Sequence, residues 1–166
     1  MNIEYRVLTL EDINDYKSIR LELLKHNPKS FGSSFEEESM FTIERWESRL
    51  QNQNARSFGA YDGNEIVGLC VLVKNPRMKM KHKATLNSMY VKPTHRGKGI
   101  SKRLLSEVFQ HVQENKIEIL TLSVVSDNVG AMKLYKNLGF VEEGMEKKAI
   151  KYDNEYFDLI LMQKYL

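Results

Sequence analysis

The stretch from Met89 to Ser101 reads MYVKPTHRGKGIS and leads from an alternating strand pattern into a long amphipathic helix. Gly97 and Gly99 allow the backbone to turn tightly and to approach a ligand closely, since glycine has no Cβ. A helix start also presents unpaired N–H groups and the positive end of the helix dipole. Four cations surround this start: Arg96, Lys98, Lys102 and Arg103. Although neither GxxxxGK[ST] nor GxGxxG is present, the segment predicts a loop that binds a diphosphate.

On the C-terminal side of this loop, apolar periodicity predicts a helix, a buried strand, a second helix and two strands. The expected ranges are 97–114, 117–125, a helix begun by Ser126 or Asp127 and ended at Gly139, and strands near 140–147 and 156–164. A strand, helix and strand in this order predict a parallel crossover between 84 and 125.

On the N-terminal side, the pattern predicts strand 3–8 and a helix that begins after Thr9 and ends at Asn27-Pro28. A second helix is expected from Ser34 to Leu50, with Glu36, Glu37 and Glu38 in its first turn. The turn Asp62-Gly63-Asn64 joins strands 56–61 and 65–73, and strand 84–91 follows. The chain is therefore expected to have an α/β fold with a mixed sheet.

Composition agrees with one globular domain spanning 1–166, because 42% of the 166 residues are hydrophobic and 28% are charged. The net charge of +3 is mild, and the basic stretch 74–83 has no interleaved aromatics, so neither favours a nucleic-acid partner. No apolar run is long enough to span a membrane. Cys70 is the only cysteine and is expected to be a small buried residue, so we expect a cytoplasmic protein without disulfides.

Two motifs together resemble the GNAT superfamily of acetyl-CoA-dependent N-acetyltransferases. The first is RxxGx[GA] at 96–101, and the second is N-x-x-A-x-x-L-Y-x-x-x-G-F at 128–140. Ser101 departs from the first motif, and its small side chain predicts only slightly altered phosphate packing. The resemblance implies a single-domain fold whose central, mostly antiparallel sheet contains a splayed parallel strand pair and has flanking helices.

The resemblance also implies acetyl-CoA as co-substrate, without a metal. Backbone groups of Met89, Tyr90 and Val91 would hold the pantetheine arm. The diphosphate would be held by the backbone N–H groups of Arg96, Gly97, Lys98, Gly99, Ile100 and Ser101. Asn128 matches the position whose amide contacts the cofactor, and Tyr135 matches the tyrosine near the thioester sulfur. From the residues alone, Asn128 could equally begin its helix and Tyr135 could be an ordinary core residue.

The implied reaction is direct attack of a primary amine on the thioester in a ternary complex. Backbone N–H groups near Tyr90 would stabilise the oxyanion, and Tyr135 would protonate the leaving thiolate. This proton transfer is uphill by about 2 kcal/mol from the ordinary pKa values of tyrosine and a thiol. Strand 84–90 lacks a carboxylate base. Two alternatives stay open: an amine of low pKa with a water relay, or a carboxylate from Glu36, Glu37 or Glu38.

The acceptor is expected to be a small-molecule or peptide amine. Acidic and aromatic residues favour a cationic amine, such as a polyamine, an aminoglycoside or a peptide N-terminus. These residues are Phe31, Phe35, the three glutamates, Trp46, Tyr152, Asp153 and Tyr156. The missing base also motivates an alternative function, a catalytically inactive CoA-binding sensor. A monomer and a homodimer are equally compatible with the sequence.

Overall fold

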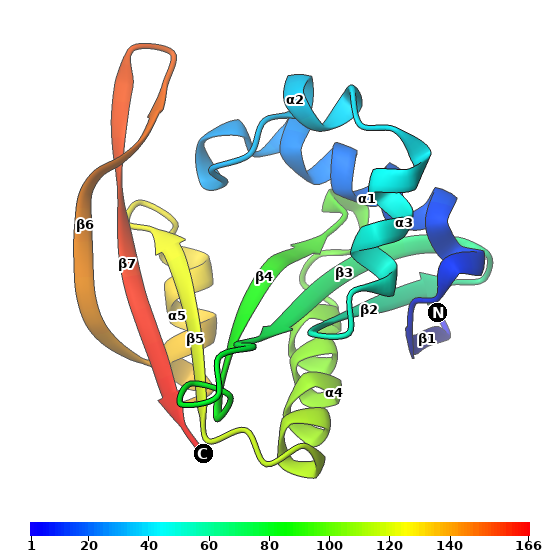
Figure 1. The fold of residues 1–166 in the computed structure, drawn as a ribbon. Helices are drawn as coiled ribbons and strands as arrows, with labels where there is room; N and C mark the ends of the chain where they lie inside the picture. Colours follow the sequence, from blue (N-terminus) through cyan, green and yellow to red (C-terminus); the bar gives the residue numbers. More distant parts are fainter.

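A seven-stranded sheet with the order β1-β2-β3-β4-β5-β7-β6 organises the computed structural model, which describes residues 1–166 (Figure 1). The strands are β1 (Ile3–Val7), β2 (Ala55–Asp62), β3 (Glu65–Lys74), β4 (Lys83–Val91), β5 (Ile119–Val125), β6 (Val141–Tyr152) and β7 (Glu155–Tyr165). Every neighbouring pair is antiparallel except β4 and β5, which are parallel. The predicted mixed, mostly antiparallel sheet with one parallel pair is confirmed.

Helices cover both faces of the sheet (Figure 1). They are α1 (Ile13–His26), α2 (Phe35–Ser39), α3 (Ile43–Gln51), α4 (Ile100–Glu114) and α5 (Val129–Asn137), with short 3-10 helices η1 (Leu10–Asp12), η2 (Pro28–Ser30) and η3 (Pro93–His95). One buried cluster joins α1 and α3 to the sheet, and a larger one joins α4 and α5 to it. Two separate cores therefore fix the sheet from opposite sides.

The single helix expected from Ser34 to Leu50 is wrong, because the structure contains two helices there. The Ser34 side chain begins α2 by accepting the Glu37 N–H, as predicted. Thr42 then adopts an extended backbone, and its hydroxyl accepts the Arg45 N–H at 3.3 Å, which begins α3. A threonine hydroxyl that bonds the backbone competes with continuous helix, so the chain turns between Met40 and Thr42.

The parallel pair separates soon after it forms. β4 and β5 pair only at Lys83–Ile119, Ala84–Leu120 and Thr85–Thr121, whereas β5 stays paired with β7 as far as Val125. In β4, the register against β3 shifts between Asn87 and Tyr90, and Ser88 has φ of 59°. Such a bulge bends a strand and increases its twist. The splayed strand pair that the family resemblance implies is thus present, and it opens toward the start of α4.

Candidate active site

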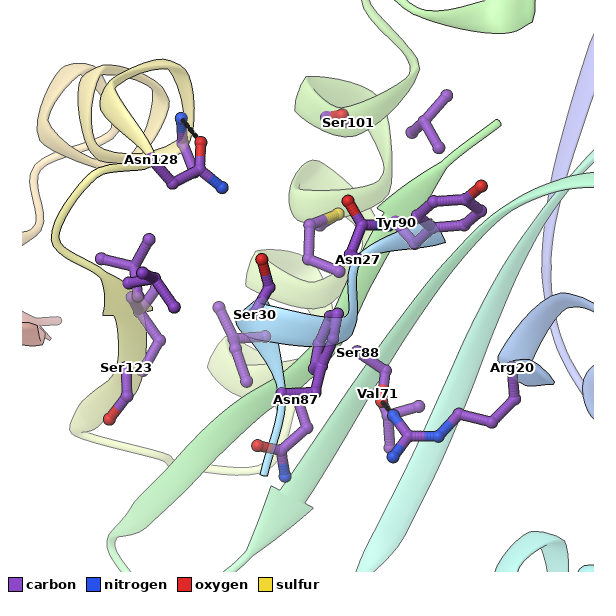
Figure 2. A pocket seen from close by; sticks show the side chains of 18 of the residues that line it. Arg20, Asn27, Ser30, Val71, Asn87, Ser88, Tyr90, Ser101, Ser123 and Asn128 are labelled. Carbon is purple, nitrogen blue, oxygen red and sulfur yellow. Dashed lines mark hydrogen bonds between the residues drawn. The ribbon is translucent and has the colours of Figure 1, made fainter. Parts of the chain in front are cut away.

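A cleft of about 1190 Å³ lies where β4 and β5 separate. It extends from the loop before α4, between the two strands, to side chains of α1, α3 and β2. Figure 2 shows Ser101 and Asn128 at one end and Arg20 and Ser88 at the other. Since the cleft is continuous, a ligand bound by the loop could reach the side chains of α1.

The loop before α4 has the geometry expected of a diphosphate site. The backbone N–H groups of residues 97–102 have no acceptor within the protein, and Gly97 and Gly99 have φ values of 74° and 80°. Those angles lie in the left-handed region that favours glycine. The predicted set shifts by one residue, because the Arg96 N–H already donates to the Pro93 carbonyl while the Lys102 N–H is free. Six successive donors at a helix N-terminus fit an anion such as the diphosphate of acetyl-CoA.

Two cationic side chains of the loop stabilise it by donating hydrogen bonds to nearby backbone carbonyls. Arg96 Nε donates to the Val91 carbonyl at 2.9 Å, and Lys98 Nζ donates to the Thr94 carbonyl at 3.1 Å. Arg96, Gly97 and Ser101 line the cleft, whereas the Ile100 side chain is buried in the larger core. The backbone, more than the side chains, therefore supplies the donors of this loop.

The strand predicted to hold pantetheine lies along the cleft. Met89, Tyr90 and Val91 all line it, and β4 has no strand partner on the β5 side after Thr85. The Tyr90 hydroxyl donates to Glu22 of α1 at 3.0 Å. Burial, together with Glu22, raises the pKa of Tyr90 to about 12. This anchored side chain fixes the β4 backbone beside the cleft.

Asn128 combines the two roles considered for it. Its Oδ1 accepts the Ala131 N–H at 3.1 Å and begins α5, so the prediction of Ser126 or Asp127 as the N-cap is wrong. An asparagine oxygen meets the free donors of a helix start well. Asn128 also lines the cleft (Figure 2), and its one side-chain hydrogen bond is made by Oδ1, not by Nδ2. The cap therefore leaves the amide nitrogen available to a ligand.

Tyr135 reaches the cleft from α5 and is 7% exposed. Its ring meets Phe140 edge-on with centroids 5.6 Å apart, and its hydroxyl has no hydrogen-bond partner in the protein. Burial raises the pKa of Tyr135 above its ordinary value, and the nearby Cys70 adds to the effect. The phenol is therefore protonated throughout the neutral range and can act as a proton donor.

Cys70 is fully buried, and burial raises the pKa of its thiol to about 12. Because the thiolate is the reactive form, we expect dithiobis(nitrobenzoate) to label the native protein at least about 100-fold more slowly than the urea-unfolded chain at pH 8. Absorbance of the released thiol measures both rates. Equal rates would contradict the buried position.

None of the three glutamates proposed as a base lines the cleft. Glu36 and Glu37 are exposed, whereas Glu38 is 1% exposed. The Glu38 carboxylate accepts from Arg20 Nε at 2.8 Å, Arg20 Nη2 at 3.0 Å and Arg49 Nη2 at 2.7 Å. Burial opposes its charge, but the bonds from both arginines outweigh burial and lower the pKa of Glu38. This carboxylate is a structural anion.

Arg20 connects that ion cluster to the bulge in β4. Its Nη1 donates to the Ser88 hydroxyl at 2.7 Å, and Figure 2 shows the guanidinium pointing from α1 toward Ser88. Ser88 is 8% exposed and holds the left-handed backbone angle of the bulge. The buried arginine therefore stabilises the strained residue at which β4 bends.

The acceptor residues expected from the sequence are mostly elsewhere. Of the aromatic residues expected around the acceptor, only Phe31 lines the cleft. Trp46 is in the core, and Tyr152 and Tyr156 are exposed on the β6–β7 hairpin. Asp153, in the turn of that hairpin, is exposed as well. Sequence reasoning missed the side chains that take their place: Tyr16, Arg20, Arg49, Asn52 and Ser57. The one signal available in the sequence for this set was Arg20, a cationic residue directly after Ile19 in the apolar stripe of its helix.

The described residues contain no cluster of three or more histidine, cysteine, aspartate or glutamate side chains that could hold a metal ion. No helix of the structure has the length and hydropathy needed to cross a membrane.

The sequence matches the Acetyltransferase (GNAT) family over residues 20–140. The chain therefore belongs to the GNAT family, and its relatives are acetyltransferases. It is 31% identical over 78 residues to an L-methionine sulfoximine/L-methionine sulfone acetyltransferase of Salmonella typhimurium, covering 46% of this chain and 45% of that protein. It is 29% identical over 77 residues to an L-amino acid N-acyltransferase of Escherichia coli, again covering 46% and 45%. The chain thus matches about half the length of these curated relatives.

Solved structures agree with the fold along the chain. A probable acetyltransferase from Staphylococcus epidermidis superimposes with a TM-score of 0.80 at 26% identity, covering 99% of both chains. A GNAT acetyltransferase from Streptococcus pneumoniae gives a TM-score of 0.88 at 22% identity, covering 99% of this chain and 100% of that one.

Proposed function

We propose that residues 1–166 form a single N-acetyltransferase domain that moves an acetyl group from acetyl-CoA to a primary amine by direct attack in a ternary complex. The observation that carries this proposal is the row of six unpaired N–H groups at residues 97–102, placed where the splayed strands open. Family membership supports acetyl-CoA as the co-substrate.

Each part of the cleft then has a defined task. The N–H groups of 97–102 bind the diphosphate, the backbone of Met89, Tyr90 and Val91 pairs with the pantetheine arm, and the Asn128 amide adds a donor. Acetyl-CoA supplies an acetyl thioester, whose carbonyl carbon bonds to the amine nitrogen while the carbon–sulfur bond breaks. Backbone N–H groups near Tyr90 stabilise the negative charge that develops on the carbonyl oxygen.

Tyr135 donates its proton to the leaving thiolate. Although burial raises the pKa of this phenol, the same burial acts on a thiol, as the value of about 12 at Cys70 illustrates. A thiolate that leaves into the same buried surroundings would have its pKa raised in the same direction, so burial of both groups would not by itself enlarge the uphill step of about 2 kcal/mol estimated from ordinary values.

The proton of the amine leaves through water in this proposal. The only carboxylate that lines the cleft is Asp127, which is bound to Lys29 at 3.0 Å. That carboxylate is occupied by the Lys29 ammonium group, and it is half exposed. The amine must therefore lose its proton without a dedicated glutamate.

Calorimetry with acetyl-CoA tests the proposal, and Gly99→Ala is the informative variant. A Cβ at Gly99 meets no protein atom but favours other backbone angles and projects from the binding loop, so we expect acetyl-CoA to bind at least about tenfold more weakly. Gly63→Ala is the matched control, since Gly63 also has positive φ and open space and lies in the β2–β3 turn. Binding within twofold of wild type is expected there.

Absence of any heat with millimolar acetyl-CoA would overturn the proposal. Tight CoA binding without thiol release on any amine would instead favour the catalytically inactive sensor. A monomer or homodimer, the lack of a nucleic-acid partner and a cytoplasmic location stay predictions.

A further inference from the structure

The acceptor end of the cleft carries positive charge. Four cationic side chains line the cleft, Arg20, Lys29, Arg49 and Arg96, against the single carboxylate of Asp127. Lys29 is neutralised by Asp127, and Arg96 lies at the diphosphate loop. Arg20 and Arg49 share the one carboxylate of Glu38, so this cluster keeps an uncompensated positive charge. A cationic polyamine would be repelled here.

The two arginines differ in what they can still bind. Arg20 uses Nε, Nη1 and Nη2 for Glu38 and Ser88. Arg49 gives only one bond to Glu38, through Nη2. Because a guanidinium has five N–H donors in a planar fork, Arg49 retains donors suited to a second oxyanion. Its side chain is 31% exposed and lines the cleft, so an acceptor could reach it.

Further polar side chains line the same cleft as Arg49. Ser57 is 6% exposed and lines the cleft, and its hydroxyl has no hydrogen-bond partner in the protein. The hydroxyl oxygen itself is not buried, so it can meet a ligand or a water molecule in the cleft. The Tyr16 hydroxyl lies close enough to the Arg49 guanidinium to accept one of its donors, which still leaves part of the five-donor fork for a ligand, and Asn52 follows α3. Ser57 pairs in register with Val71, and Val71 with Asn87, the residue before the bulge.

We propose that the acceptor is an amine that also bears a carboxylate, as in an amino acid, and that Arg49 binds this carboxylate with the help of Ser57. This inference rests on the proposed acetyl transfer and names the substrate class of the same cleft. The expectation of a cationic acceptor is thereby replaced.

Matched acceptors test the inference on the wild-type enzyme. The twenty amino acids, their carboxamides and spermidine are compared by thiol release at a fixed acetyl-CoA concentration. We expect the best amino acid to exceed its amide at least tenfold in kcat/KM, and spermidine to be poorer still. An amide or spermidine that matches the best amino acid would overturn the inference.

Arg49→Gln should raise KM for the best amino acid at least tenfold, while KM for its amide changes less than twofold. Arg45→Gln on the same helix is the control, because Arg45 is exposed and does not line the cleft. An equal loss for acid and amide would overturn the role of Arg49. Calorimetry distinguishes a failure of this inference from a failure of the proposed function. If acetyl-CoA binds but only amides are acetylated, this inference alone is rejected. If acetyl-CoA does not bind, the proposed function is rejected as well.

Discussion

Tyr135→Phe is expected to lower kcat about 100- to 10,000-fold, the usual contribution of a positioned general acid. KM for acetyl-CoA should change less than about threefold, because the phenylalanine ring preserves the contact with Phe140. The hydroxyl makes no hydrogen bond within the protein, so its removal should leave the unfolding temperature nearly unchanged. Steady-state thiol release and thermal unfolding measure the two effects separately.

The pH profile sharpens this prediction. Since burial raises the pKa of Tyr135, the wild-type phenol should remain protonated up to at least about pH 10, and kcat should show no loss from its ionisation below that pH. Tyr156→Phe is the control, because Tyr156 is 52% exposed and outside the cleft. Turnover of Tyr135→Phe within threefold of wild type would exclude the phenol as the acid.

Glu38→Gln should lower the free energy of unfolding by about 3–5 kcal/mol, which is typical when one partner of a buried ion pair is removed. Arg20 is 8% exposed and would lose at least one of its two bonds to residue 38, because a glutamine amide has a single acceptor oxygen, while its positive charge would face that of Arg49. Urea unfolding measures the change. Glu36→Gln is the control, since Glu36 is exposed and a change within about 0.5 kcal/mol is typical there.

The pH dependence of this difference follows from the lowered pKa of Glu38. A carboxylate with a lowered pKa in the folded state adds stability above its unfolded pKa of about 4.3, and this stability disappears as pH falls through the folded pKa. The difference in the free energy of unfolding between wild type and Glu38→Gln should therefore reach its full value above about pH 5 and decrease below about pH 4. A gap under 1 kcal/mol at pH 7 would contradict the ion cluster.

Local sequence signals predicted most elements because their causes are local. Ser34 begins a helix and Asp62-Gly63-Asn64 turns a hairpin through contacts between residues that are close in the chain. The split at Thr42 and the cap at Asn128 show the limit of this reasoning. In both segments several residues could begin a helix, and sequence alone did not select the one whose side chain meets the free N–H groups.

The role of Glu38 was also beyond the sequence. The three consecutive glutamates have the same side chain and lie in the same helix turn, yet only one of them is buried. Its partners Arg20 and Arg49 come from α1 and α3, and Arg20 reaches Ser88, which lies 68 residues away in the chain. A pattern along the chain contains no information about which charged groups meet across it.

The sequence by itself determined the order of helices and strands along most of the chain, the glycine-containing loop before α4 and the family motifs. Each of these depends on the spacing of residues within a short segment. Only the tertiary structure decided the character of the acceptor end of the cleft. There, α1, α3 and β2 place Arg20, Arg49 and Ser57 in one cleft, whereas the acidic and aromatic residues expected at this end, apart from Phe31, are buried or lie outside the cleft. Charge recognition depends on distance in space, which packing of remote segments sets.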